Sequence, residues 1–383
     1  MKKTIKFLCI FLILISLFGC SKETSELNID SENYLFDTDY QYFINSTSVM
    51  ARSDKGYYYF DDCLLKFFDT EKRIETVVCD QSNCEHTDND CSAYFDHHYS
   101  KTVLSYYNGS LITDYIETKN NISTHYACSI STDGKSRKKK CKLYKTTGSS
   151  SARFCVHRGY VYLVRELASE EKNKSTLKIY KAPLETKKNS LQEIFSFTGY
   201  DCSLTGFEIY ANHLYFDLSY YTDSKGNGYS TVVFDYDLIN DKCNEINLNN
   251  YEYGFIVNNR NIVYYNKKSQ NYDIYNIDTK KVINKININE IGYISFDGEN
   301  YYIDTAQSVN IGINDIRTIY IVNPQGKILK EISIDNDNQC HFGYKDFIFF
   351  DKYNNEFGSS KIIKIYYDKA INNSSNSEFI SVE

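Results

Sequence analysis

The sequence lacks the short motifs that assign a catalytic chemistry to an enzyme. It contains no G-x-S-x-G nucleophile elbow, no Walker phosphate loop, no H-E-x-x-H helix and no D-x-D-x-D-G calcium loop. Aspartate and glutamate are plentiful, but spacing alone selects no carboxylate pair for hydrolysis. The sequence therefore names no catalytic residue.

An excess of positive charge is also missing. The chain has 43 basic and 50 acidic residues, and its formal net charge is −7 at pH 7. Nucleic-acid binding usually needs a basic face that neutralises phosphates. We therefore expect no nucleic-acid partner.

Long apolar runs are absent after the first twenty residues, and the run within them is short. A basic segment with Lys2, Lys3 and Lys6 precedes the apolar residues 7–18. Such a run suits the centre of a signal peptide, whereas an ordinary membrane-spanning helix needs about 20 residues. The pattern predicts a signal peptide over residues 1–19 and export of the chain that follows.

The end of this run, Leu17-Phe18-Gly19-Cys20, resembles the lipobox of bacterial lipoproteins. The resemblance implies cleavage before Cys20, a diacylglyceryl group on its sulfur and, often, an acylated amine. Phe18 departs from the pattern, because that position more usually holds a small or β-branched residue. A plain secretory signal peptide and an uncleaved N-terminal anchor are the alternatives, and both would also export the domain.

Residues 20–35 are interpreted as the lipidated cysteine and a polar tether. Two acyl chains hold a protein firmly to a bilayer, at about 0.8 kcal/mol per buried CH₂ group. A flexible chain of about 13 residues has a reach of roughly 20 Å. The predicted location is the extracytoplasmic face of the bacterial cell membrane, with the globular domain, residues 36–383, close to the lipid.

Sustained helical periodicity is missing from the globular domain, and tryptophan is absent from the whole chain. Tyrosine occurs 37 times, and tyrosine and β-branched residues favour strands. A turn, a Tyr-rich apolar strand, a polar hairpin and a second strand recur along the chain. The strands that open the units are 57–60, 111–112, 160–163, 214–216, 262–265, 301–303 and 347–350. The second strands are 64–69, 142–144, 177–181, 232–237, 272–278, 318–322 and 361–367.

This repetition predicts an all-β protein with the architecture of a β-propeller, with about seven blades of three to four antiparallel strands. Strands near residues 40–50 are expected to complete the last blade and close the ring. Stacked β-sandwiches are the alternative. The even spacing without a linker favours the propeller.

The units are similar to those of Tyr-rich propeller lipoproteins of clostridia and their relatives, most of which have no assigned activity. The resemblance covers nearly the whole mature chain and implies six to eight blades at the cell surface, without implying a reaction. Signatures of WD40 and kelch repeats are absent, because the chain has no Trp and no paired glycines open the units.

The cysteines carry the one chemical constellation of the sequence. Ten of the 12 cysteines follow Cys20, and in an exported protein this number invites disulfides. Cys79, Cys84, His86 and Cys91 lie within thirteen residues of a polar loop. Three thiolates and an imidazole are a sufficient ligand set for tetrahedral Zn²⁺. Because protein would fill all four positions, such a metal would be structural rather than catalytic.

Three interpretations of this loop, residues 79–91, stay open. The residues bind a structural zinc ion, or they form a local disulfide such as Cys79 or Cys84 with Cys91, or the thiols are unpaired or pair with distant cysteines. The C-x4-C-x-H-x4-C spacing is not that of a standard zinc finger, but a loop can bend to permit it. A haem attachment would need C-x-x-C-H, which the loop does not contain. No other cofactor is predicted.

A basic run interrupts the acidic chain. It consists of Lys135, Arg137, Lys138, Lys139 and Lys140. Each lysine near an anionic surface contributes about 1 kcal/mol, so the run is a candidate contact for lipid headgroups or teichoic acids. The alternative is a solvated hairpin.

The predicted function is that of a non-catalytic surface propeller that binds a peptide, a protein or a glycan. The membrane anchor, the scaffold and the missing catalytic motifs support this hypothesis. One rival is an extracellular hydrolase or lyase that acts on polysaccharide or peptide, since the fold alone does not decide between the two. The other is a structural accessory subunit of an envelope complex.

Overall fold

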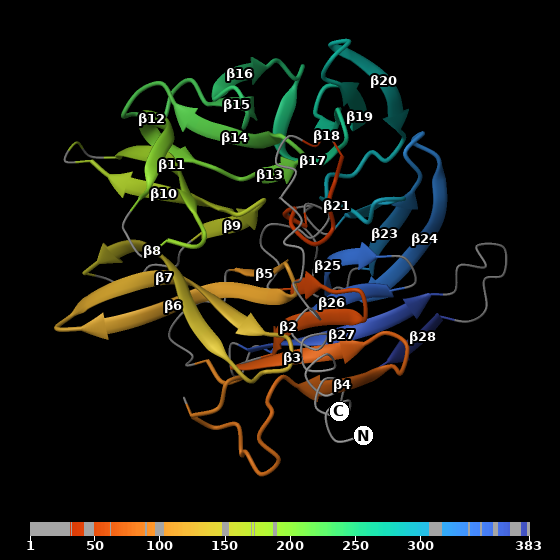
Figure 1. Cartoon of the computed structure of the whole chain (residues 1–383). Helices are drawn as coiled ribbons and strands as arrows, with labels where there is room; N and C mark the ends of the chain where they lie inside the picture. Colours follow the sequence, from red (N-terminus) through yellow and green to blue (C-terminus); the bar gives the residue numbers. More distant parts are fainter. Residues whose placement is uncertain are drawn as a thin grey trace, which may run out of the picture.

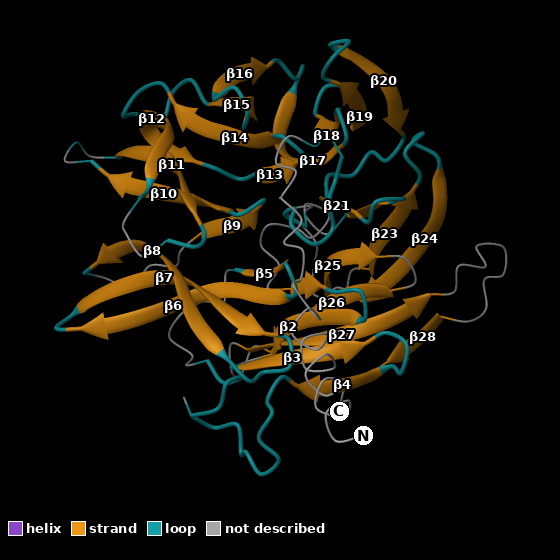
Figure 2. Cartoon of the chain, in the orientation of Figure 1, coloured by secondary structure: helices purple, strands orange, loops and turns teal. Residues whose placement is uncertain are grey.

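The computed structural model describes residues 31, 33–41, 50–61, 63–88, 90–95, 103–147, 153–169, 171, 173–186, 190–305, 316–335, 338–344, 347–354, 359–367 and 377–380. Strands and the turns between them make up this part of the chain (Figure 2). It holds no helix that is long and apolar enough to cross a membrane. The predicted signal peptide, Cys20 and most of the predicted tether lie outside the described residues.

The described residues form 28 strands in seven successive groups of four. The first four groups are β1 Met50–Arg52, β2 Gly56–Asp61, β3 Leu64–Asp69 and β4 Ile74–Val77; β5 Leu104–Tyr107, β6 Ser110–Lys119, β7 Ile122–Ser131 and β8 Arg137–Thr146; β9 Arg153–His157, β10 Tyr160–Ala168, β11 Lys174–Pro183 and β12 Gln192–Ser203; β13 Phe207–Tyr210, β14 His213–Tyr221, β15 Ser230–Asp237 and β16 Lys242–Ile246. The last three groups are β17 Tyr251–Asn258, β18 Asn261–Asn266, β19 Asn271–Asn276 and β20 Lys281–Ile286; β21 Tyr293–Phe296, β22 Tyr301–Asp304, β23 Ile316–Val322 and β24 Ile328–Asp335; β25 Asn338–Tyr344, β26 Phe347–Asn354, β27 Ser359–Tyr367 and β28 Ser377–Ile380.

Antiparallel pairing of neighbours along the chain builds every sheet. Five groups form separate four-stranded sheets, and the third and fourth groups share one eight-stranded sheet. They are joined because β12 pairs with β14, at Tyr200↔Tyr221 and Ser203↔Ser219. The predicted all-β propeller is therefore confirmed. The seven groups form six sheets, because two groups share one sheet.

The sheets stand around a common centre (Figure 1). The first strands of neighbouring groups contact one another, as β1 does with β5, β5 with β9, and β17 with β21. The last group lies beside the first, where β27 contacts β2. Radial repetition of this kind leaves only short, protected strand edges.

Burial follows the position of a strand within its group. Second strands lie between two partners and are almost wholly buried, as in β18 and β22, so they read as continuous Tyr-rich apolar runs. Fourth strands lie at the rim, and most of β20 is exposed. Apolar clusters fill the space between neighbouring sheets, and tyrosines such as Tyr57, Tyr215 and Tyr264 are among their largest buried side chains.

The phase of the repeat differs from the prediction. The Tyr-rich strands expected to open each unit are second strands, each preceded by an inner strand that is short in most groups. Residues 142–144, expected as a second strand, belong to β8, the fourth strand of its group.

The predicted closure of the ring by residues near 40–50 is wrong for the described part of that segment. Met50 pairs with Tyr59, so β1 joins the first sheet, and the last sheet takes its fourth strand from Ser377–Ile380. A tight turn explains this choice, because Ser53 N–H donates to Gly56 O over 2.8 Å. Pairing across a short turn costs far less chain entropy than pairing with a strand more than 300 residues away.

The two ends of the ring carry different sets of turns. In an antiparallel group the turn between the first and second strands lies at the same end as the turn after the third strand. Backbone hydrogen bonds join them: Leu184 N–H donates to Gly159 O, and Leu238 N–H donates to Asn212 O, both over 2.8 Å. We call this end the first-turn face and the opposite end, with the turns between second and third strands, the far face.

Candidate metal centre

The predicted Cys/His loop connects β4 with β5, and so joins the first two sheets. It extends below β3 and β4 in the view of Figure 2. The segment just after Cys91 is fixed by strand-like pairing with the start of β3, where Leu65 N–H donates to Ala93 O over 2.9 Å and Phe95 N–H donates to Cys63 O over 2.8 Å. Ala93 is fully buried, in the apolar cluster between the two sheets. The loop is therefore part of the fold and not an appended tail.

The structure brings all four predicted ligands together. The Sγ atoms of Cys79, Cys84 and Cys91 and a ring nitrogen of His86 all lie within 4.8 Å of one another. His86 Nδ1 lies 3.2 Å from Cys91 Sγ. In a regular tetrahedral site with Zn–S bonds near 2.3 Å, ligand atoms are separated by about 3.8 Å. Shifts of about 1 Å or less would therefore complete the coordination geometry.

Local turns produce this convergence. Cys84 N–H donates to Gln81 O over 3.4 Å, and Cys91 N–H donates to Asp88 O over 3.2 Å, so each cysteine closes a turn. His86 has a φ of 56°, in the left-handed region that costs a non-glycine residue about 1 kcal/mol or more. That conformation reverses the chain between Cys84 and Cys91 and directs the imidazole back towards the thiols.

The thiols differ in their electrostatic surroundings. Burial raises the pKa of the Cys91 thiol to about 11, against a lowering contribution from the backbone N–H of Ala93. Burial acts in the same direction on Cys79, but hydrogen bonds from the Gln81 backbone and from neighbouring side chains outweigh it and lower its pKa. Backbone N–H groups two residues after a cysteine thus donate to two of the sulfurs, as outer-shell donors do for metal-bound thiolates.

Arg137, from the predicted basic run, supports the loop from the second sheet. Its Nη2 donates to the carbonyl oxygens of Ser92 over 2.5 Å and Tyr94 over 3.0 Å, and its guanidinium lies 4.1 Å from the centre of the Phe95 ring. The side chain is directed to the loop and not to solvent. It also places a fixed positive charge beside a cluster of thiols.

Three of the four lysines of the basic run have acidic partners. Lys135 pairs with Asp133 over 3.1 Å, Lys139 pairs with Glu117, and Lys140 pairs with Glu185 over 2.5 Å. Lys138 is exposed on β8. Contact of this run with an anionic surface stays a prediction, and it would compete with these ion pairs.

Thiols outside the cluster are separate from it. Cys63 and Cys141 are buried, and the thiols of Cys128, Cys155, Cys202 and Cys243 are free; of these only Cys243 is exposed. Burial raises the pKa of Cys128 to about 11, which keeps that thiol protonated and unreactive at neutral pH. The lipid-attachment residue Cys20 lies outside the described residues.

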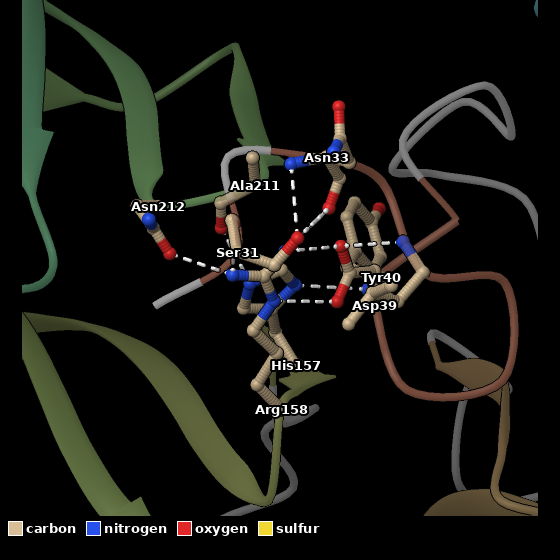
Figure 3. A network of polar contacts seen from close by, with 9 residues as sticks. Ser31, Asn33, Asp39, Tyr40, His157, Arg158, Ala211 and Asn212 are labelled. Carbon is tan, nitrogen blue, oxygen red and sulfur yellow. Dashed lines mark hydrogen bonds and ion pairs between the residues drawn. The ribbon is translucent and has the colours of Figure 1, made fainter. Parts of the chain in front are cut away.

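A second polar network was not predicted from the sequence. Arg158, in the turn between β9 and β10, makes a two-pronged ion pair with Asp39: Nε to Oδ1 is 2.7 Å and Nη2 to Oδ2 is 2.9 Å (Figure 3). Arg158 is 3% exposed and Asp39 is 1% exposed, so the pair is desolvated. Its partners are 119 residues apart, and the only local signal is an arginine in a turn where most other units have Asn, Lys or Asp.

Comparison with known proteins gives distant matches. No family model and no curated protein matches the chain. Among solved structures, the β-propeller domain of the Trilobed protease from Pyrococcus furiosus is 10% identical, with a TM-score of 0.49 over 88% of this chain and 96% of that chain. BamB from Moraxella catarrhalis is 7% identical, with a TM-score of 0.39 over 83% of this chain and 96% of that chain. The AfRom2 CNH domain is 11% identical, with a TM-score of 0.42 over 85% of this chain and 95% of that chain. These values carry no argument about function, and the sheet topology alone establishes the propeller.

Proposed function

We propose that Cys79, Cys84, His86 and Cys91 bind one structural Zn²⁺ ion that fixes the junction between the first two sheets of a surface-displayed binding propeller. The observation that carries the zinc site is the convergence of all four ligand atoms within 4.8 Å. Three sulfurs and one nitrogen form a soft ligand set that suits zinc and disfavours magnesium or calcium. No position is left for water, so the ion stabilises the fold and performs no catalysis.

A metal also resolves the electrostatics of the cluster. Three thiols packed together cannot all ionise without mutual repulsion, and a divalent cation removes that repulsion while it deprotonates its ligands. The Arg137 guanidinium, already directed at the carbonyl groups of the loop, offsets the remaining negative charge.

Cobalt substitution tests the site directly. Co²⁺ in a tetrahedral site with three thiolates gives intense charge-transfer and ligand-field absorption, so we expect a chromophore that zinc displaces at one equivalent. Cys84→Ser and His86→Ala are expected to weaken or change the spectrum. Cys243→Ser, which removes an exposed thiol outside the cluster, is the matched control. Spectra that are the same in Cys84→Ser and in the unaltered protein would reject the site.

The wider function is binding of a peptide, a protein or a glycan at the outer face of the cell membrane, with Cys20 as the lipid attachment. A rigid ring of sheets with connecting loops at both ends supports this role, because binding residues concentrate on loops held by such scaffolds. Affinity capture from cell-wall and membrane fractions tests it. A partner is expected above the level of an unrelated lipoprotein, and recovery equal to that control would count against binding.

A further inference from the structure

The chain that leads from the membrane anchor into the propeller is bound to the first-turn face. We call residues 31 and 33–41 the strap. Asn108 N–H, in the turn between β5 and β6, donates to Asp37 O over 2.6 Å. Arg158 N–H, in the corresponding turn of the next group, donates to Thr38 O over 2.7 Å. The strap therefore contacts equivalent turns of successive groups, and Figure 1 shows it in red near the centre of the ring.

Side chains fix the strap in this position. Besides its ion pair with Asp39, Arg158 donates from Nη1 to Ser31 O over 2.6 Å and from Nη2 to Asn33 O over 2.8 Å (Figure 3). Its Nη1 also donates to Asn212 Oδ1 over 2.6 Å, which adds the turn between β13 and β14. One arginine thus joins the beginning of the strap, at Ser31 and Asn33, and its later residue Asp39 to two neighbouring groups of strands.

The neighbouring residue His157 also holds the strap, near its C-terminal end. Tyr40 N–H donates to His157 Nδ1 over 3.0 Å, and His157 Nε2–H donates to Ala211 O over 2.7 Å. His157 is 1% exposed, and burial lowers its pKa to about 4. The neutral ring has one acceptor and one donor, and both are used. At the end of the strap, Gln41 Nε2 donates to Arg52 O and its Oε1 accepts from Arg52 N–H.

From this arrangement we infer that the first-turn face is the surface of the propeller that faces the lipid bilayer, and that the far face is the one presented to a partner. The inference rests on the proposed lipid attachment at Cys20. Ten residues lie between Cys20 and Ser31, and a flexible tether of this length has an r.m.s. reach of about 18 Å. Because the strap is bound to the first-turn face and not free, the tether leaves the domain from that face and holds it towards the membrane.

Two exposed side chains offer matched reporters of this orientation. Ile239 follows β15 at the first-turn face and is 44% exposed, and Tyr229 precedes the same strand at the far face and is 56% exposed. The eight residues of β15 place its ends about 24 Å apart. The protein contains no tryptophan, so Ile239→Trp and Tyr229→Trp each introduce a single reporter into a silent background.

The experiment uses the full-length lipidated chain reconstituted into vesicles that carry dansyl-labelled headgroups. Energy transfer from tryptophan to dansyl is expected to be at least about twofold more efficient for Ile239→Trp than for Tyr229→Trp, given the separation along β15. Equal or reversed efficiencies in protein that floats with the vesicles would overturn the orientation and leave the anchor intact. Protein that fails to float would refute the anchor, and the orientation with it.

The strap itself is tested in the same assay. Asp39→Asn removes the carboxylate that pairs with Arg158, and release of the strap is expected to reduce the difference between the two reporters. Asp37→Asn is the control, because the Asp37 side chain is exposed and only its backbone carbonyl contacts Asn108. A difference that persists in a folded Asp39→Asn variant would show that the strap does not set the orientation.

Discussion

The buried pair of Asp39 and Arg158 allows the sharpest test of how the strap is held. Asp39→Asn keeps the size of the side chain and removes its charge. The carboxylate accepts two hydrogen bonds from Arg158 and one from Leu35 N–H over 3.0 Å. The amide can replace at most part of this set, because one of its two polar ends donates and does not accept.

The magnitude follows from burial. Removal of one partner from a buried ion pair typically costs 3–5 kcal/mol, since the other charge is left desolvated without compensation. Arg158 keeps its bond to Asn212, and it either keeps its bonds to Ser31 O and Asn33 O or is hydrated when the strap is released. Both effects reduce the cost, so we expect a loss of about 2–4 kcal/mol in the free energy of unfolding.

Urea unfolding, followed by far-ultraviolet circular dichroism, measures this change, and limited proteolysis reports release of the strap. Asp37→Asn should stay within about 0.5 kcal/mol of the unaltered protein, as exposed substitutions usually do. If Asp39→Asn were equally silent and the strap equally protected, the pair would not hold the strap. A double-mutant cycle with Arg158→Met should give a coupling energy of about 0.5–3 kcal/mol.

Three further predictions concern other parts of the fold. Gly134→Ala should destabilise the protein by about 1–3 kcal/mol more than Gly109→Ala in the same unfolding assay. Both glycines have φ near 70°, but of the two only Gly134 would bring an added Cβ against a backbone atom, Val78 O, at 2.4 Å. Burial lowers the pKa of His157 to about 4, below its unfolded value near 6.5. This group therefore contributes stability that is present above pH 6.5 and is lost, by up to about 3 kcal/mol, as the pH falls towards 4. His157→Gln should flatten the pH profile of the unfolding free energy in that window, and an unchanged slope would contradict the assignment. Removal of zinc with a strong chelator should lower the unfolding temperature of the unaltered protein and leave that of Cys84→Ser unchanged, and equal shifts in both would contradict a stabilising metal.

The sequence reveals the second strands of this propeller best. Residues such as those of β18 and β22 are buried on both faces, and they read as short Tyr-rich and β-branched runs after a turn. The inner strands are hidden because several have only three to five residues, too few for alternation to be visible. β13 also contains the buried Glu208, whose charge argues locally against a core strand. Burial raises the pKa of Glu208 well above its usual range, which permits the carboxyl to lie there uncharged.

The candidate metal centre was readable because its ligands are close in sequence. Cys79 and Cys91 are twelve positions apart, so a single loop can bring them together without knowledge of the fold. The support from Arg137 was not readable, because it comes from the next sheet, 45 residues beyond Ser92. The strap was missed for the same reason: its polar composition is typical of a tether, and its binding depends on turns far along the chain, such as that of Arg158, which is 119 residues from Asp39.

Metal content, measured together with the number of free thiols, tests the central claim most directly. The soluble domain, residues 21–383, would be purified without reducing agent or chelator. We predict about one zinc ion per chain, lost in Cys84→Ser and retained in Cys243→Ser, with the cluster thiols titratable once the metal is removed. A protein without metal, in which Cys79, Cys84 and Cys91 titrate as fewer than three thiols under denaturing conditions, would contradict the account and assign the loop to a disulfide.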